Sequence, residues 1–509
     1  MKVRQSMSKE EKSRRTGKKY KKPAKNNNDI LERRNKELRN RETNIISFVF
    51  AGLFMLMIGY LVYFNYKLAP DIINSPYNKR VEEQEAKVTR GDILAYDGTV
   101  LATTQTDEDG NQTRYYPYDN IFCHVIGLSS AKTGVEGAQN YNLMNAPKNI
   151  LSQISSDTDG EKAQGNTVIT SLMPQLQEAA YDALGANRGA VIAMEPSTGR
   201  ILAMVSKPDY DPNAAPTDYS EWLTYSSKNS VLLNRATQGL YAPGSTFKIM
   251  TALEYLRENN NDSNFSFDCS GSAYIEGGTT IPCFDNTAHG YETLKTAFAN
   301  SCNSAFSTIG AELNKAKFRE LCTTFLFNSS LPIDIEYSKS SFNLDADSGI
   351  SEAQETGIGQ GKTMMSPLHN LLIAATVAND GVMMKPTVVD RVQDANGTVV
   401  QETEQEEVVR AITADEADTV TDYMRAVVMQ GTGYAFKNSW YNAAGKTGSA
   451  QYDSSSNVHS WFTGFAPYDN PQIAICVVLE GGYTGVPSAQ YVAKSVLDTY
   501  FSIIWYNIK

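Results

Sequence analysis

An uncharged run of 20 residues, Ile45 to Phe64, constrains the fold of this chain more than any other feature. A helix needs about 20 consecutive apolar residues to cross a bilayer, so the run predicts one transmembrane helix over 45–66. Residues 1–43 carry 16 Lys and Arg but 6 Asp and Glu, whereas the whole chain has a formal net charge of −11. The positive-inside rule therefore predicts a short cytoplasmic N-terminus and an extracellular remainder.

Two other interpretations of this region fit less well. A cleaved signal peptide has a shorter apolar core and a shorter polar lead, and a small-residue cleavage site follows it. Basic residues beside a membrane span usually set topology or contact anionic lipid, which argues against a nucleic-acid partner. Because residues 1–44 are rich in Lys, Arg and Asn, we expect this tail to be disordered.

Residues 67–165 read as a small domain and a linker. The segment Thr89 to Thr104 contains two strand-like runs around Asp97-Gly98, which predicts a hairpin. A stalk, 74–88, precedes this hairpin, and acidic, Asn-rich sequence from Ala146 to Gly165 predicts a linker after it.

Residues 166–509 alternate between helical and strand-like patterns. A helix is expected up to Leu184, and two apolar strands follow around a turn at 196–199. Strands at both ends with helices between them indicate an α+β fold, an antiparallel sheet with helices packed on it. The further helices are expected at 245–258, 366–380, 413–429 and 489–505, and the further strands near 441–451, 459–466 and 472–479.

The cysteines and histidines show no metal-binding pattern. None of the six cysteines forms a CxxC pair and the four histidines are scattered, so we expect no metal and no cofactor. Disulfides are allowed outside the membrane, and Cys269 with Cys283 is the candidate pair. Cys302 is interpreted as a small half-buried residue and His289 as a structural one.

A serine and a lysine at helical spacing form the first chemical motif. In "GLYAPGSTFKIMTALEYL", Ser245 and Lys248 are three residues apart on the first turn of an apolar-faced helix, so the amine can reach the hydroxyl. A serine is a weak nucleophile until a base takes its proton, and a helix N-terminus offers N–H groups to an oxyanion. The spacing alone is weak evidence, because it recurs at Ser129 and Lys132.

Two further motifs follow in a fixed order. Ser301-Cys302-Asn303 lies in "LKTAFANSCNSAFSTIG", on or entering a helix, and Lys446-Thr447-Gly448 lies in "NAAGKTGSAQ", on an expected strand. Each triplet alone is common. The ordered set of three, each in a suitable secondary structure, is specific.

This combination is the signature of penicillin-binding proteins and class A β-lactamases, and the chain resembles the penicillin-binding proteins closely. Segments such as "RGAVIAMEPSTGRILAMVS", "HGYETLKTAFANSCNSAF" and "AGKTGSAQ" are similar to their transpeptidase domain over about 189–500. "RGDILAYDGTVLA" and "HVIGLSSAKTGVEGAQN" resemble the membrane-proximal domain of class B, monofunctional members, including the penicillin-binding protein A type. The resemblance implies a transpeptidase fold at 166–509, with an all-helical subdomain, and a pedestal domain at 67–165.

The resemblance also implies a peptidoglycan D,D-transpeptidase that β-lactams acylate. Ser245 would attack the D-Ala-D-Ala bond of a stem peptide, release D-alanine and pass the acyl group to an amine on another stem. The implied roles are Lys248 as acylation base, Ser301 as proton relay, Asn303 as orienting group, Lys446 and Thr447 as carboxylate ligands, Gly448 as the site of close approach, and Ser245 and Ser449 as backbone donors of the oxyanion hole.

Lys248 needs a lowered pKa to act as a base, because a free lysine has a pKa of about 10.4. A second ammonium about 6 Å away would lower the pKa by about two at an effective dielectric constant of 20. We expect Lys446 to supply that charge, with partial burial acting in the same direction.

Three other functions remain open at this stage: a D,D-carboxypeptidase, a β-lactamase, and a non-catalytic β-lactam-binding scaffold or sensor. The membrane anchor argues against the β-lactamase, as does the lack of a Glu-x-x-Leu-Asn segment between the second and third motifs. Class B members lack a glycan-polymerising domain. The resemblance therefore implies a membrane partner of the SEDS family in cell-wall synthesis, and it leaves open whether the protein acts in elongation, division or sporulation.

Overall fold

The computed structural model describes residues 26–64, 88–145, 162–214, 230–452, 457–481 and 488–508. The chain divides into two units, Met1–Ile73 and Asn74–Lys509. The predicted stalk, apart from Val88, and most of the predicted linker lie outside the described residues.

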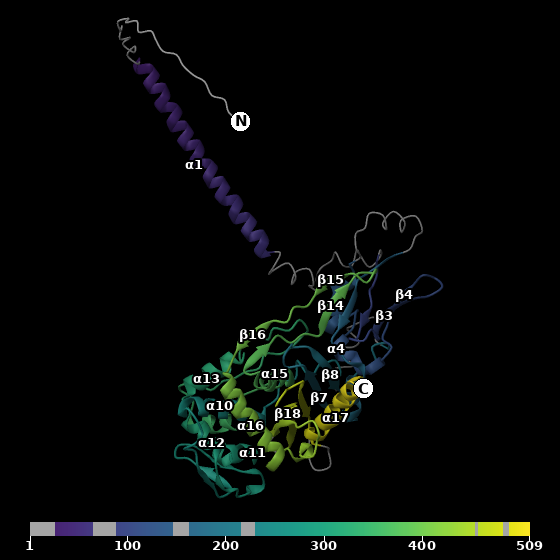
Figure 1. Ribbon diagram of the computed structural model, residues 1–509, viewed down its shortest axis with the longest axis vertical. Coiled ribbons are helices and arrows are strands. Elements are labelled where there is room, and N and C mark those ends of the chain that lie inside the picture. The colour runs from purple at the N-terminus through teal and green to yellow at the C-terminus, as the bar shows by residue number, and fades with distance from the viewer. Residues whose placement is uncertain are drawn as a thin grey trace, which may run out of the picture. The chain divides into compact units, whose positions relative to one another are not determined.

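The first unit contains one long helix, α1 (Asn27–Tyr63) (Figure 1). The most apolar 18-residue stretch of α1 has a mean hydropathy of 2.5, and none of its residues is buried. The helix is therefore long and apolar enough to span a membrane. The predicted disorder of 1–44 is wrong from residue 27 onward. Glu32 with Lys36 and Glu37 with Arg41 are spaced i,i+4 with the acid first, an arrangement that stabilises a helix.

A five-stranded antiparallel sheet forms the centre of the second unit, in the order β17-β18-β19-β7-β8. Its strands are β7 (Gly189–Met194), β8 (Ile201–Lys207), β17 (Ala444–Gln451), β18 (Val458–Ala466) and β19 (Ile473–Leu479). The predicted strands are confirmed within a few residues, and so is the turn between β7 and β8.

Both faces of β7, β8 and β19 are buried, which explains why these strands read as continuous apolar runs. Along β19, Ile475 and Val477 join the hydrophobic cluster that contains α8 (Pro174–Leu184) and α17 (Ala489–Ile508). Cys476 and Val478 alternate with them and join the cluster on the other face, which contains α15 (Pro367–Ala378). The sheet is thus sandwiched between helices.

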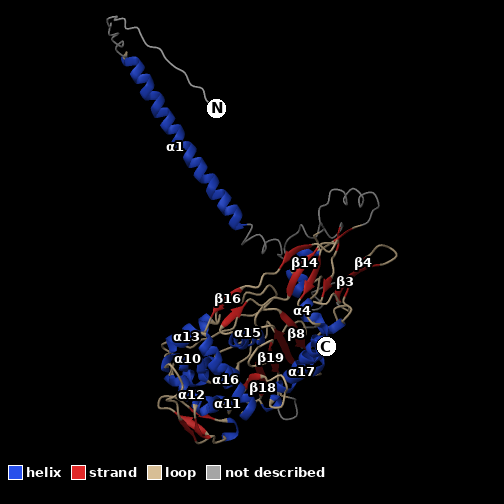
Figure 2. Ribbon diagram, viewed as in Figure 1, coloured by secondary structure: helices blue, strands red, loops and turns tan. Residues whose placement is uncertain are grey.

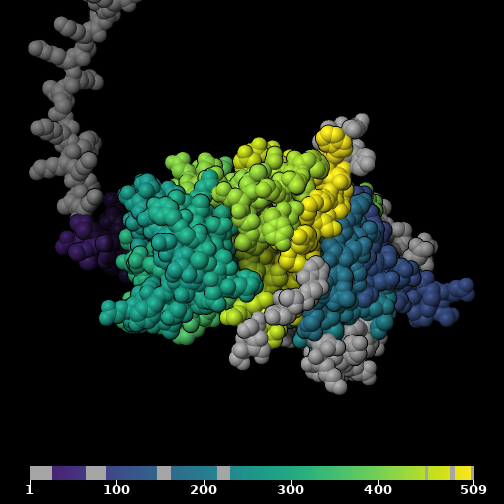
Figure 3. Space-filling view, turned by 90° about the horizontal axis from the view of Figure 1, so that it is seen from below, coloured from purple at the N-terminus to yellow at the C-terminus, as the bar shows by residue number. Residues whose placement is uncertain are grey.

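Most of the remaining helices gather at one end of this unit, opposite the strands β3, β4, β14 and β15 (Figures 1 and 2). In Figure 3 the teal surface of the earlier of these helices adjoins the yellow-green surface of the C-terminal third. These helices are α10 (Lys248–Asn259), α11 (Leu294–Ala299), α12 (Asn303–Glu312), α13 (Lys315–Thr324), α14 (Ile350–Gly357) and α16 (Ala414–Gln430). Short elements among and beside them are η3 (Gly244–Phe247), β9 (Phe267–Cys269), β10 (Ser272–Tyr274), β11 (Thr280–Pro282), η4 (Phe284–Asn286), β12 (Gly290–Glu292), β13 (Val382–Met384), β16 (Glu407–Arg410) and η5 (Tyr434–Phe436).

A second, six-stranded sheet combines segments that are far apart in the sequence, in the order β15-β14-β6-β2-β3-β4. The first part of the chain supplies β2 (Ile93–Leu94), β3 (Val100–Thr106), β4 (Gln112–Tyr115) and β6 (Thr167–Thr170), and the later part supplies β14 (Val389–Gln393) and β15 (Val399–Glu402). The other elements of this region are β1 (Val88–Thr89), η2 (Asp119–Phe122), α4 (Cys123–Ile126), α5 (Gly134–Ala138), α6 (Asn140–Leu143) and β5 (Ala163–Gln164). The sheet therefore draws strands from both sides of the predicted boundary at 165.

A buried ion-pair network holds the region around this sheet together. Glu136 on α5 is fully buried and accepts hydrogen bonds from the guanidinium groups of Arg90 and Arg114, each at 2.6 Å at its closest. Burial alone would raise the pKa of Glu136, but the two guanidinium groups outweigh it and hold the pKa below its usual value. The carboxylate of Glu136 thus links Arg90, near the start of this region, to Arg114 of β4 and to its own helix, α5.

Replacing Glu136 with Gln leaves two buried guanidinium groups without their counter-charge, so we expect the free energy of unfolding to fall by about 3–5 kcal/mol. Urea denaturation of the purified chain measures this loss. The matched control is Glu406→Gln, because Glu406 is 65% exposed and its contact with Lys385 is 3.5 Å long. For this control we expect the free energy of unfolding to fall by less than about 0.5 kcal/mol. Equal losses in the two variants would contradict the prediction.

Candidate active site

Ser245 lies on a tight turn, η3, directly before α10. Gly244 has φ 55°, and a Cβ there would lie 2.5 Å from the carbonyl oxygen of Ser449, so only glycine fits. Phe247 is fully buried among the rings of three other phenylalanines and anchors the turn in the core. Ser245 itself stays half-buried and accessible at the turn.

Lys248 is the first residue of α10 and is fully buried. Its Nζ donates hydrogen bonds to the carbonyl oxygen of Ser301 at 2.7 Å, to Ser301 Oγ at 3.3 Å and to Asn303 Oδ1 at 2.8 Å. No hydrogen bond joins Nζ to Ser245 Oγ among the described residues. The sequence predicted that reach, and the structure instead holds the amine on the second motif.

The second motif occupies the junction between α11 and α12. Ser301 has φ 56°, a left-handed conformation that costs energy in a residue with a side chain. Cys302 is the N-cap of α12 and Asn303 its first residue. This confirms that the triplet enters a helix, and the left-handed turn directs Ser301 Oγ toward the amines.

The third motif approaches the same point from β17. Lys446 is fully buried, and its Nζ donates to Ser301 Oγ at 3.0 Å and to the carbonyl oxygen of Thr447 at 3.0 Å. A Cβ on Gly448 would lie 3.2 Å from the backbone nitrogen of Thr246, so β17 and the serine turn are in close contact. Ser449, next along the strand, is exposed.

Burial is the main cause of the altered electrostatics of the two lysines. It lowers the pKa of Lys248 to about 7. Burial also lowers the pKa of Lys446 well below its usual value, and the charge of Lys248 adds to this shift. The sequence argument gave the second cation the leading part and burial the lesser one. In the structure burial is the main cause for both lysines, and the charge of Lys446 is not among the causes that shift the pKa of Lys248.

The structure thus brings together all the residues that the three motifs predicted, around Ser301 Oγ and the serine turn. It adds three residues that sequence reasoning missed. The rings of Phe306 and Phe298 lie with their centroids 5.4 Å from Lys248 Nζ and 5.6 Å from Lys446 Nζ. Thr432 shares a 2.5 Å hydrogen bond with Thr447. The two phenylalanines flank the second motif at three residues on either side, a signal that was present in the sequence.

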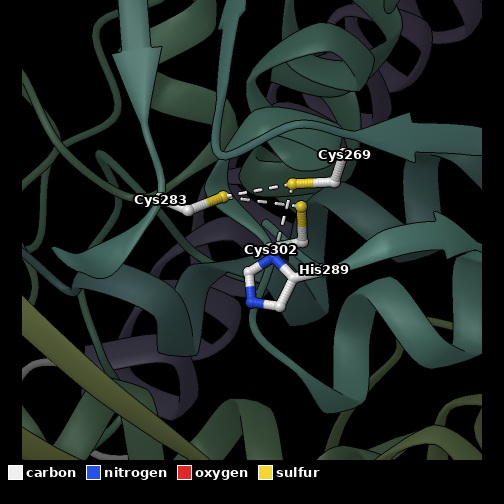
Figure 4. A group of neighbouring side chains, drawn as sticks. All are labelled: Cys269, Cys283, His289 and Cys302. Atoms are coloured by element: carbon white, nitrogen blue, oxygen red, sulfur yellow. Dashed lines mark hydrogen bonds between the residues drawn. The ribbon is translucent and has the colours of Figure 1, made fainter. Parts of the chain in front are cut away.

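The candidate Cys269–Cys283 disulfide is not formed in this structure. The two sulfurs lie 3.6 Å apart as free thiols. They form a cluster with Cys302 and His289, in which one ligand atom from each residue lies within 4.8 Å of all the others (Figure 4). The absence of a CxxC pair is therefore no argument against a metal site here, because these residues come from four separate segments of the chain.

Comparisons with known proteins identify the family to which this chain belongs. Residues 189–498 match the penicillin binding protein transpeptidase domain, and residues 90–168 match the penicillin binding protein A dimerisation domain. The chain is 32% identical to the peptidoglycan D,D-transpeptidase PbpA of Mycolicibacterium smegmatis, over 80% of this chain and 87% of that protein.

Solved structures are similar over most of the chain. The D,D-transpeptidase domain of a peptidoglycan glycosyltransferase from Eggerthella lenta is 31% identical with a TM-score of 0.73, over 82% of this chain and 99% of that chain. Penicillin-binding protein A of M. tuberculosis, as its imipenem acyl-enzyme complex, is 27% identical with a TM-score of 0.73, over 82% and 100% of the two chains. The chain belongs to the penicillin-binding protein transpeptidase family and, with its dimerisation domain in front, to the class B members.

Proposed function

We propose that this protein is a serine-type peptidoglycan D,D-transpeptidase with Ser245 as its nucleophile. The observation that carries the proposal is the convergence of two buried lysines on Ser301 Oγ, beside the serine turn. Family membership and the acyl-enzyme complexes of similar structures support it.

In the acylation step, the neutral amine of Lys248 takes the proton of Ser245 Oγ as this oxygen attacks the carbonyl carbon of the D-Ala-D-Ala bond. The tetrahedral oxyanion is stabilised by the backbone N–H groups of Ser245 and Ser449, which the close contact of η3 and β17 brings near each other. The proton then passes through Ser301 to the leaving amine. D-Alanine departs and the stem peptide stays bound as an ester.

Recognition of the donor rests on β17. The cation of Lys446 and the hydroxyl of Thr447 receive the terminal carboxylate, whose negative charge favours the protonated form of Lys446. Asn303 is placed to orient both the donor amide and Lys248, since its Oδ1 already accepts from that amine. An acceptor amine then attacks the ester and forms the cross-link. β-Lactams acylate Ser245 because they imitate the terminal dipeptide.

The proposed position of the chain in the membrane is based on α1. We place residues 1–44 in the cytoplasm, a membrane span at 45–66, a pedestal domain and linker at 67–165 and the catalytic domain at 166–509 outside the membrane. This single-pass arrangement is supported by the basic residues before the apolar stretch of α1. A glycan polymerase of the SEDS family is the proposed membrane partner.

Fluorescent penicillin labelling tests the nucleophile. We expect covalent labelling of the full chain that disappears in Ser245→Ala, because the proposed acyl-enzyme ester forms on the hydroxyl of Ser245. The matched control is Ser129→Ala, since Ser129 and Lys132 repeat the same spacing outside the site. Labelling that persists in Ser245→Ala would refute the assignment, and an unlabelled wild-type chain would favour the non-catalytic scaffold.

The pH dependence of acylation tests the base. Below a pKa of about 7 Lys248 carries its proton and cannot accept another, so the second-order rate constant of acylation should rise with pH through about 7. Lys248→Arg stays protonated, and we expect it to lose about 10²–10⁴-fold in that constant. Lys362→Ala is the control, because this lysine is 70% exposed and paired with Glu352. A profile without a step near neutral pH would count against Lys248 as base.

The fate of the acyl group separates a transpeptidase from a D,D-carboxypeptidase. We expect the full chain, given a stem pentapeptide and an acceptor amine, to release D-alanine and to form the cross-linked product. The ratio of transfer to hydrolysis should rise with acceptor concentration, because amine and water compete for one ester. Hydrolysis that no acceptor concentration can divert would identify the carboxypeptidase.

A further inference from the structure

The cluster of Cys269, Cys283, Cys302 and His289 is built from four segments that meet beside the second catalytic motif. Cys269 ends β9, Cys283 is the N-cap of η4, and Cys302 is the N-cap of α12. His289 precedes β12 and directs Nδ1 at the sulfur of Cys269 (Figure 4). The three cysteines are buried and His289 is half-buried.

Three of the six distances between ligand atoms in the cluster are close to the edges of one tetrahedron. Zn–S bonds of about 2.3 Å and Zn–N bonds of about 2.0–2.1 Å give S–S edges of about 3.8 Å and S–N edges of about 3.5 Å in tetrahedral geometry. The sulfur of Cys283 lies 3.6 Å from that of Cys269 and 3.7 Å from that of Cys302. Cys269 Sγ lies 3.4 Å from His289 Nδ1, and the remaining pairs lie within 4.8 Å.

The surroundings also suit thiolates bound to a cation. The backbone N–H of Ser304 points at the sulfur of Cys283 at 3.5 Å, and that of Ala305 at the sulfur of Cys302 at 3.4 Å. The hydroxyl of Ser304 lies 3.1 Å from the sulfur of Cys283. Such outer contacts orient ligands and stabilise negative sulfur.

We propose that Cys269, Cys283, Cys302 and His289 bind one Zn²⁺ ion in a closed, structural site. Four protein ligands leave no open position, so the ion has no part in the chemistry of acylation. Three thiolates and a neutral imidazole are a ligand set that favours zinc over harder cations. Thiols must lose their protons on binding, so loading the site releases protons to solvent.

The proposed zinc site holds the backbone of the second motif in place. Cys302 stands between Ser301 and Asn303, both of which hold Lys248. Asn303 Nδ2 also donates to the carbonyl oxygen of Pro282, the residue before Cys283, at 3.1 Å. A bound ion therefore clamps the β9–β12 segment to the backbone that positions the relay and orienting groups. This consequence rests on the proposed function, whereas the metal site itself does not.

Metal analysis of the purified full chain tests the site without any substrate. We expect one zinc per chain by mass spectrometry of the digested protein, and six titratable thiols after denaturation with a chelator. Replacement of zinc by Co²⁺ should produce the thiolate-to-metal charge-transfer absorption and the intense ligand-field bands of a tetrahedral sulfur-rich site.

Matched cysteine variants locate the ion. Cys269→Ala should reduce the zinc content at least tenfold at a fixed low concentration of free zinc. Cys322→Ala should retain one zinc, since Cys322 is equally buried but lies in α13, outside the cluster. Removal of zinc from the wild type should slow penicillin acylation about tenfold or more, and zinc should restore it.

Three results would overturn the proposal. The first is a wild-type chain that neither contains zinc nor takes it up when supplied. The second is four titratable thiols after denaturation, which would mean that a cysteine pair is oxidised. The third is iron in place of zinc. If zinc is present but Ser245 is not labelled by penicillin, the metal site stands and the proposed function fails.

Discussion

Two lysine amines buried around the hydroxyl of Ser301 are the constraint on which the candidate active site depends. Lys248 and Lys446 are both fully buried, and neither has a carboxylate partner among the described residues. Burying a charge without a counter-charge is expensive. The site offsets that cost only with neutral acceptors and with the faces of two phenylalanine rings. Both pKa values fall as a direct result, and in the proposed mechanism the donor carboxylate supplies the missing charge.

The rest of the scaffold makes this unfavourable arrangement rigid. Lys446 is fully buried and its strand β17 pairs along its whole length with β18, so β17 cannot move away from the serine turn without disturbing the core. Asn370 of the buried helix α15 donates to Thr246 Oγ1 at 3.1 Å, and its carbonyl oxygen accepts from Thr463 of β18 at 3.3 Å. The central sheet, α15 and the serine turn are therefore linked by direct hydrogen bonds.

The sequence predicted regular elements and motifs well because both leave local signals. Apolar runs bounded by turn residues identified β7, β8, β18 and β19, and the motifs identified the two lysines whose amines donate to Ser301 Oγ. The sequence failed where distant segments combine. Nothing in residues 389–402 indicates that β14 and β15 join the sheet of the first domain. The order of causes behind the pKa of Lys248 was also out of reach, because burial depends on packing and not on spacing.

The cysteine cluster shows the same limit and explains the composition of the second motif. Its members are separated by loops of unequal length, so no spacing rule finds them. In the fold, the middle residue of Ser301-Cys302-Asn303 points into the cluster while both neighbours contact Lys248. Cys302 has an extended backbone (φ −61°, ψ 111°), and successive side chains of extended backbone point to opposite sides. A strained residue, such as the left-handed Ser301, persists only when its surroundings over-determine it. The N-cap of α12, the Asn303–Pro282 hydrogen bond and the clustered sulfurs supply that constraint.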